Sequence, residues 1–109
     1  MSSELKQLNQ SNFSKEILKY SGVCVVDFWS ETCIPCKQMS RLLNEIRAEI
    51  ADEVVIGKVN ADENSSLVEQ YGVRGLPTLL IFKKGQLVET RSGIDRKQVI
   101  RKAIESYLI

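Results

Sequence analysis

The stretch VVDFWSETCIPCK, residues 25–37, decides the fold prediction because it connects a buried strand to a helix through two cysteines. The run VCVVDFW, residues 23–29, is apolar and rich in β-branched residues, which is typical of a buried strand. After the cysteines, apolar residues recur at the spacing of an amphipathic helix with one face in the core. These residues are Met39, Leu42, Leu43, Ile46 and Ile50. Cys33 is therefore expected directly after a strand, at the start of a helix.

The flanking segments continue this alternation of strands and helices. We predict strands at 4–10, 54–62, 78–85 and 86–93, the last two joined in a hairpin at Lys84-Gly85. We predict helices from Ser11 or Asn12 to Gly22, around Leu67–Tyr71, and after Asp95, with Ser/Asn and Asp95 as N-caps. The order β-α-β-α-β-α-β-β-α predicts an α/β fold, in which helices cover both faces of a mixed central sheet.

The size and composition of the chain are those of one folded domain. It has 109 residues, 43% of them hydrophobic and 27% charged, with no linker, repeat or change of composition. We therefore expect a single domain over residues 1–109. The 15 Lys and Arg residues nearly balance the 14 Asp and Glu residues. Without a basic field to bind phosphates, nucleic-acid binding has little support.

Neither a targeting signal nor a membrane-spanning segment is expected. The start, MSSELKQLNQSNFSKE, has mixed charges and no apolar stretch of the kind found in a secretory signal. The longest apolar runs, such as 23–26 and 79–82, are far shorter than the roughly 20 residues of a membrane-spanning helix. The sequence therefore favours a soluble cytoplasmic protein without membrane contact.

The pair Cys33 and Cys36 could hold part of a metal site, form a structural disulfide or carry out redox chemistry. A zinc or iron–sulfur site needs about four ligands, and this chain has three cysteines and no histidine. We therefore expect no metal within one chain, although two chains could share a cluster. A structural disulfide would close too short a loop to constrain the unfolded chain much. Cys24 lies within a predicted strand, where a cysteine packs as a small hydrophobe.

The position of the pair favours redox chemistry. A helix N-terminus stabilises a thiolate, and Lys37 adds a positive charge, so the pKa of Cys33 should fall. We expect Thr32 to be the N-cap and Pro35 to suit the first turn. Cys33 is the predicted nucleophile, and Cys36, one turn further, the resolving thiol.

These motifs resemble the thioredoxin family over nearly the whole chain. VVDFWSETCIPCK resembles its active-site segment, YGVRGLPTLLIFKKG, residues 71–85, resembles the segment around its cis-proline, and Gly93 matches a glycine near the last strand. The resemblance implies a thioredoxin fold with about five strands and four helices. It also implies a protein-disulfide oxidoreductase that needs no bound cofactor. The implied partners are client disulfides and a flavoenzyme reductase as electron donor, and the implied state is a monomer.

The resemblance also implies roles for individual residues. Asp27 matches a buried aspartate that accepts a proton from Cys36, with a pKa raised by desolvation, and Lys58 matches a lysine that modulates it. Pro77 matches the cis-proline, which leaves the backbone of Leu76 free to pair with a client strand. The remaining residues of the expected client surface are Trp29, Thr32, Ile34, Pro35, Gly75 and Gly93.

Three departures from the family pattern affect this surface. Ile34 stands where the usual motif has glycine, and Thr32 stands where tryptophan usually precedes the first cysteine. The helix after Cys36 lacks the family's usual proline, so we expect it to be straighter. Ile34 restricts the backbone more than glycine does and adds an apolar group. We expect both substitutions to change partner choice and the reduction potential, with a sign that the sequence does not give.

Three functions are consistent with this sequence. The first is a general reductase of client disulfides. The second is a specialised or more oxidising member, with a potential far above the value of about −270 mV typical of thioredoxin. The third is a binding module that holds a partner around Ile34 and Pro77, with incidental redox chemistry.

Overall fold

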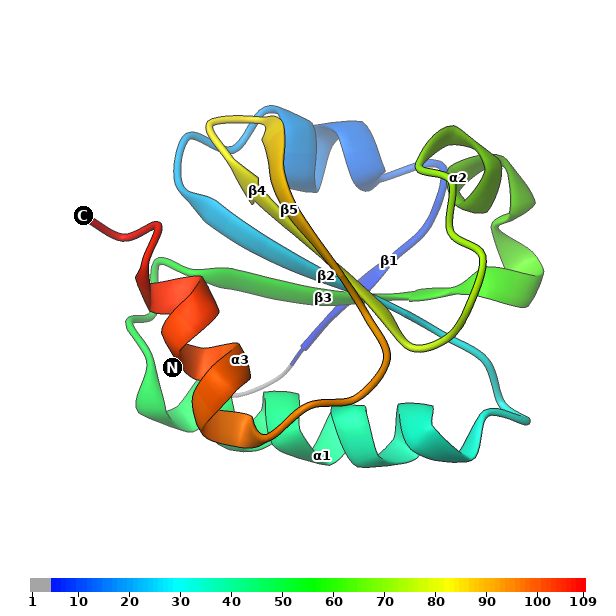
Figure 1. Cartoon of the computed structure of the whole chain (residues 1–109). Helices are drawn as coiled ribbons and strands as arrows, with labels where there is room; N and C mark the ends of the chain where they lie inside the picture. Colours follow the sequence, from blue (N-terminus) through cyan, green and yellow to red (C-terminus); the bar gives the residue numbers. More distant parts are fainter. Residues whose placement is uncertain (1–4) are drawn as a thin grey trace.

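A mixed sheet of five strands, in the order β1-β3-β2-β4-β5, forms the centre of the computed structural model, which describes residues 5–109 (Figure 1). β1 and β2 both run parallel to β3, whereas β4 is antiparallel to β2 and β5. The mixed sheet predicted from the sequence is confirmed. The strands are β1 Lys6–Leu8, β2 Val23–Trp29, β3 Val55–Asn60, β4 Thr78–Lys83 and β5 Gln86–Ser92.

Helices cover both faces of this sheet, as predicted. In Figure 1, α1 and α3 lie on one face, and η1 and α2 lie on the other. The helices are η1 Ser14–Leu18, α1 Ile34–Glu49, α2 Ser65–Gln70 and α3 Lys97–Glu105, with a 3-10 turn, η2 Ala61–Glu63, before α2. η1 is π-helical, and α1 is continuous over 16 residues. No helix within residues 5–109 is long and apolar enough to cross a membrane.

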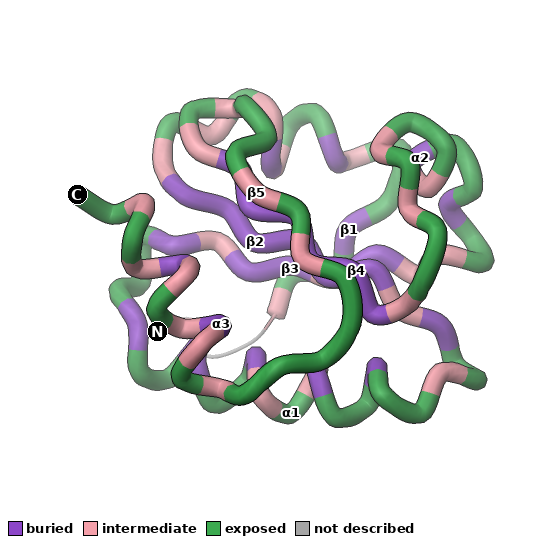
Figure 2. Tube along the Cα trace, in the orientation of Figure 1, coloured by how far each residue is buried: buried purple, intermediate pink, exposed green. Residues whose placement is uncertain are grey.

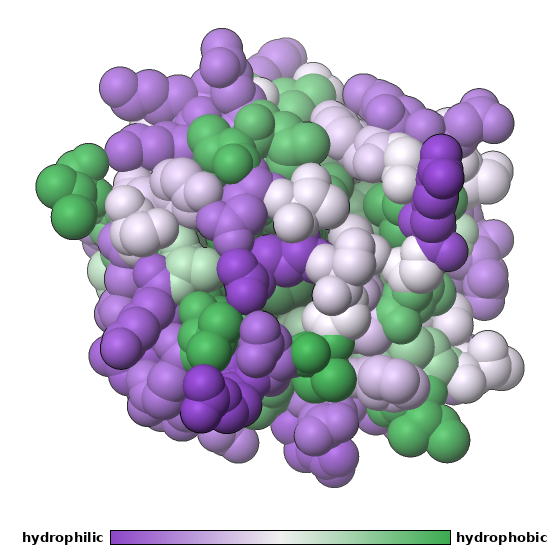
Figure 3. All heavy atoms as spheres, in the orientation of Figure 1, coloured by the Kyte–Doolittle hydropathy of each residue, from purple (hydrophilic) through white to green (hydrophobic). Residues whose placement is uncertain are grey.

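The alternation of side chains along β2 divides the core into two clusters. Val23 and Val25 face α1 and α3, whereas Cys24, Val26 and Phe28 face η1 and α2. β2 lies between β3 and β4 and is buried almost throughout, as the purple trace in Figure 2 shows. In Figure 3 the face around α3 is mainly hydrophilic, with apolar groups scattered among polar ones. Because β2 is buried between two strands, the sheet fixes the position of its end, where the loop to Cys33 begins.

The predicted hairpin between β4 and β5 is also confirmed. Lys84 and Gly85 have φ angles of 54° and 77°, so both adopt the left-handed conformation that tight hairpin turns require. A Cβ at Gly85 would lie 2.2 Å from the carbonyl oxygen of Leu18. Only glycine fits there, because the hairpin packs directly against η1.

Several predicted helix boundaries are wrong. Cys33 is the N-cap of α1 in place of Thr32, and Arg96 is the N-cap of α3 in place of Asp95. Asp95 instead accepts a hydrogen bond from the adjacent Arg96 N–H. The first helix is shorter than predicted, and its N-cap is Phe13. Local side-chain chemistry permits several caps, and tertiary packing selects among them. The predicted first strand begins at Glu4, which lies outside the described residues.

Candidate active site

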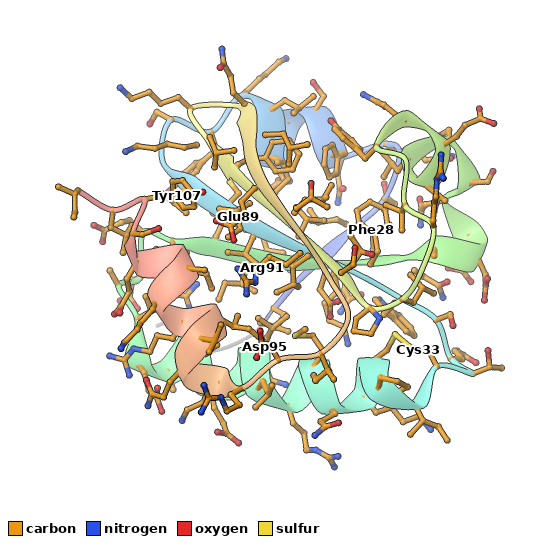
Figure 4. The ribbon with its side chains drawn as sticks, viewed as in Figure 1. Phe28, Cys33, Glu89, Arg91, Asp95 and Tyr107 are labelled. Atoms are coloured by element: carbon orange, nitrogen blue, oxygen red, sulfur yellow. A yellow bond between two sulfur atoms is a disulfide. The ribbon has the colours of Figure 1, made fainter. Side chains whose placement is uncertain are left out.

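Cys33 and Cys36 form a disulfide at the N-terminal end of α1, where Figure 4 shows Cys33 at the junction of this helix with the loop that follows β2. Their Cα atoms are 5.2 Å apart. Cys33 is partly exposed, whereas Cys36 retains only 2% of its accessible surface. An incoming thiol or disulfide can therefore reach Cys33, and the fold shields Cys36. This asymmetry fits one attacking and one resolving sulfur.

The start of α1 stabilises negative charge on Cys33. Its Sγ accepts a hydrogen bond from the backbone N–H of Cys36 at 3.2 Å, so the sulfur itself caps the helix. Pro35 lies in the first turn, where its missing N–H leaves no hydrogen bond unmade. After reduction, a thiolate in this position receives the same N–H group and the positive end of the helix dipole.

Asp27 is buried in β2 on the face that α1 covers. It has no accessible surface, and neither carboxylate oxygen has a hydrogen-bond partner among the described residues. Desolvation raises the pKa of Asp27 to about 7, against an opposing effect of the Lys58 charge. The carboxyl group can therefore both accept and release a proton near neutral pH.

Lys58 lies directly across from Asp27, as its register partner on β3. Its ammonium donates a hydrogen bond to Ser40 Oγ at 2.7 Å and sits 4.8 Å from the centre of the Trp29 ring. Lys58 thus lowers the pKa of Asp27 through its charge, whereas its hydrogen bond goes to Ser40 on α1.

Sequence reasoning missed Ser40. A signal was present, because Ser40 follows Cys36 by four residues and so lies on the same face of α1.

The peptide bond between Leu76 and Pro77 is cis, which confirms that prediction. Thr78 pairs with Phe28, so the preceding loop meets the end of β2 beside Trp29. The carbonyl of Pro77 accepts a hydrogen bond from the N–H of Gly93 at 2.8 Å. No hydrogen bond within the described part of the chain uses the backbone N–H or C=O of Leu76. The loop therefore presents the backbone N–H and C=O of Leu76 without hydrogen bonds to other described residues, at the same end of the sheet as Trp29.

The remaining predicted surface residues differ in exposure. Trp29 is half-buried, and Thr32, Pro35, Gly75 and Gly93 are exposed. Ile34 is 77% exposed, the most exposed large apolar side chain of the described chain apart from the C-terminal Ile109. An isoleucine beside the nucleophile thus contributes apolar surface to the approach of a partner.

Cys24 is separate from this site. It is fully buried within β2, and burial raises the pKa of its thiol to about 12. A thiol that stays protonated at neutral pH does not act as a nucleophile, so Cys24 packs as an apolar side chain.

A cavity of about 570 Å³ opens beside the redox pair, between α1 and the ends of β2 and β3. Besides Cys36, Trp29 and Lys58, its lining includes residues that the sequence did not single out: Ser40, Arg41 and Asn44. Within residues 5–109, no three His, Cys, Asp or Glu side chains gather in a way that could hold a metal ion.

Comparisons with known proteins agree with this geometry. A family model described as Thioredoxin matches residues 4–106. The chain is 40% identical to a thioredoxin of Rhodospirillum rubrum over 102 residues, which cover 94% of this chain and 98% of that protein. It is 40% identical over 108 residues to a thioredoxin of Acidithiobacillus ferridurans, covering 99% of this chain and all of the relative. A solved mutant thioredoxin from Halobacterium salinarum NRC-1 superposes with a TM-score of 0.89 at 27% identity, covering 98% of this chain and 93% of that one.

Proposed function

Because the chain belongs to the thioredoxin family, we propose that it is a general protein-disulfide reductase acting through Cys33 and Cys36. The observation that carries this proposal is the Cys33–Cys36 disulfide, which pairs a partly exposed sulfur at a helix N-terminus with a buried one. This arrangement suits dithiol–disulfide exchange, because one sulfur meets the client and the other completes the reaction.

The reaction begins with the reduced protein. The Cys33 thiolate attacks one sulfur of the client disulfide, which forms a mixed disulfide and releases the other client sulfur as a thiolate. Cys36 then loses its proton and attacks the Cys33 sulfur. This second step forms the Cys33–Cys36 disulfide and releases the second client thiolate. Two electrons have passed to the client, whose thiolates take up two protons.

Asp27 is the proposed acceptor of the Cys36 proton. It lies on the face that α1 covers, and its pKa of about 7 suits proton transfer at neutral pH. A water molecule can carry the proton between the two groups. Lys58 is the proposed modulator, because its positive charge favours the ionised carboxylate.

The proposed client surface surrounds Cys33. The unpaired backbone groups of Leu76 would hydrogen-bond to an extended client segment, strand to strand. Pro77, Gly75 and Gly93 would shape the surface beside that segment. Ile34 and Pro35 would contact the client through apolar surface, and Trp29 and Thr32 would complete the rim of the site.

We propose a flavoenzyme reductase as the electron donor and diverse proteins with accessible disulfides as clients. The chain would act as a cytoplasmic monomer with one domain over residues 1–109, and no cofactor of its own is needed because the two sulfurs carry both electrons.

Reduction of insulin by dithiothreitol, followed as turbidity, tests this function. The wild-type protein should shorten the lag before precipitation strongly, and Cys33→Ser should behave like the reaction without protein. A Cys24→Ser variant is a matched control, because it removes a thiol remote from the reaction and should retain the activity. Equal rates for wild type and Cys33→Ser would contradict the proposal.

A specialised or more oxidising role is the second candidate, and the exposure of Ile34 beside Cys33 supports the specialised form of it. A bulky apolar group at this position narrows the range of partners that fit. Titration of the cysteine pair against glutathione buffers distinguishes the two candidates, since a potential near −270 mV, about that of thioredoxin, supports the general reductase. A potential tens of millivolts higher, which returns to that value in Ile34→Gly, would support the specialised role.

A further inference from the structure

The open cavity beside Cys36 has a regular wall on the side of α1. Lys37, Ser40, Arg41 and Asn44 line it, and they follow one another at the i, i+3, i+4, i+7 spacing of one helix face. At 1.5 Å per residue, this wall is roughly 10 Å long. We call this cavity the α1 groove. It starts beside the redox pair and contains neither the Leu76–Pro77 loop nor Gly93.

Positive charge predominates in the α1 groove. Among residues 5–109, Lys37, Arg41 and Lys58 line it, against one carboxylate, that of Glu31. None of these three cations forms an ion pair within the described residues, whereas Lys97, Arg91 and Arg101 do elsewhere on the molecule. Three cations that form no ion pair with another described residue thus line one concave surface next to Cys36, although the charge of Lys58 also acts on Asp27.

Lys58 is held in place within this groove. Ser40 accepts one of its hydrogen bonds, and the ring of Trp29 lies 4.8 Å below the ammonium. An ammonium has three donors, so two remain available to a ligand. A fixed cation loses little conformational freedom when it binds an anion, unlike the free lysines of the surface.

We propose that the α1 groove binds acidic side chains of the client segment next to the disulfide being reduced. This inference rests on the proposed reductase function and names a class of substrate for it. The length of the groove fits about three residues of an extended chain, at roughly 3.3 Å each. The groove begins at Cys36, so a client attached to Cys33 brings its own flanking residues to the groove. Carboxylates in those residues meet Lys37, Arg41 and Lys58, which steers the encounter and fixes the register of the client.

Two synthetic peptides test this proposal. They carry the same disulfide and differ only in the residues on either side of the cysteines, which are glutamate in one peptide and glutamine in the other. The pre-reduced protein is mixed with each peptide, and the second-order rate constant of the first exchange is measured at low and high salt. We expect the glutamate peptide to react about fivefold faster at low salt, as exposed charge pairs are individually weak, and the ratio to fall towards one at 1 M salt.

Substitutions that change the charge of one residue test whether the α1 groove causes the difference between the two rate constants. Arg41→Glu should bring the ratio of the two rate constants to one or below, and Asn44→Asp, which changes the same wall almost isosterically, should lower it about twofold. Lys102→Glu is the matched control, because Lys102 is exposed on α3 and does not line the groove. It makes the same change in net charge as Arg41→Glu and should leave the ratio close to that of the wild type.

Two results would overturn the inference. One is a ratio near one in the wild-type protein at low salt. The other is an equal loss of the ratio in Arg41→Glu and Lys102→Glu, which would assign the preference to net charge. Failure to reduce the glutamine peptide at all would instead contradict the reductase function, so the two failures are distinguishable.

Discussion

Two carboxylates on the same face of the sheet, Asp27 on β2 and Glu89 on β5, show how the same chemical group serves different purposes. β4 separates the two strands, and in Figure 4 Glu89 lies close to Tyr107 and Arg91. Asp27 is fully buried and has no hydrogen-bond partner in the described structure. Glu89 on β5 accepts hydrogen bonds from Tyr107 Oη and from Arg91, both at 2.6 Å.

The two environments move the pKa of these groups in opposite directions. Desolvation raises the pKa of Asp27 to about 7, whereas the hydrogen bonds from Tyr107 and Arg91 hold the pKa of Glu89 below its usual value. A buried carboxyl group without partners is poised to exchange protons, whereas a partnered one stays ionised and joins β5 to Tyr107, just beyond the end of α3. Position and hydrogen bonding therefore separate the proton carrier from the structural group.

The largest expected effect is the pH dependence of stability due to Asp27. Its pKa rises from 3.8 to about 7 on folding, so the folded state holds its proton more tightly than the unfolded state. The free energy of unfolding should therefore fall as the pH rises from about 4 to about 7, by on the order of 4 kcal/mol. Urea unfolding of the oxidised protein, at pH values from 4 to 8, measures this change.

Asp27→Asn provides the comparison, because the amide does not titrate. The difference in unfolding free energy between the variant and the wild type should grow in favour of the variant across this pH range. A difference that is constant with pH would mean that Asp27 titrates normally in the folded protein.

The next effect concerns the rate at which Cys36 resolves a mixed disulfide. With Asp27→Asn, this step should be about 100-fold slower at pH 7, since a positioned base contributes at least that factor. In the wild type the rate should rise with pH through the pKa of Asp27. Stopped-flow release of a chromophoric thiol attached to Cys33 measures the step. Glu89→Gln is the matched control, and an equal slowing in that variant would remove the distinction between the two carboxylates.

A smaller effect is expected at the other carboxylate. Glu89→Gln should lower the unfolding free energy by about 1 kcal/mol at pH 7, through loss of charge-assisted hydrogen bonds. Because the pKa of Glu89 is depressed by folding, this contribution is present above the usual glutamate pKa and is lost as the pH falls below it. Thermal or urea unfolding at pH 7 and pH 3 tests this sign, which is opposite to that of Asp27. A stability loss that is equal at both pH values would contradict it.

The smallest effect is expected for the ion pairs between α1 and α3. Lys97 contacts Glu45 and Glu49, and Arg101 contacts Glu49, all near the surface. Lys97→Gln should lower the free energy of unfolding only slightly at low salt, and this loss should vanish in 1 M salt. Urea unfolding at the two salt concentrations measures it. A loss of unfolding free energy that persists in high salt would mean that Lys97 stabilises the fold through packing of its aliphatic side chain.

Patterns local in sequence accounted for most of the fold and for the reacting pair. The buried run of β2, the amphipathic α1 and the Lys84-Gly85 turn were predictable, because each depends on neighbouring residues. The caps at Cys33 and Arg96 were not, since several adjacent side chains could fill each position and packing chose one. The contact between Lys58 and Ser40 was also missed, because it joins residues 18 positions apart.

The sequence by itself therefore determined the order of strands and helices, the spacing of Cys33 and Cys36 and the presence of an acidic residue in a buried strand. Only the tertiary structure decided that Asp27 has no hydrogen-bond partner among the residues described, that Lys58 hydrogen-bonds to Ser40, and that cations line the α1 groove. Backbone propensity and hydrophobic spacing act between neighbours along the chain. Desolvation and charge pairing depend on groups brought together from distant parts of the sequence, so they arise only when the sheet and its helices pack.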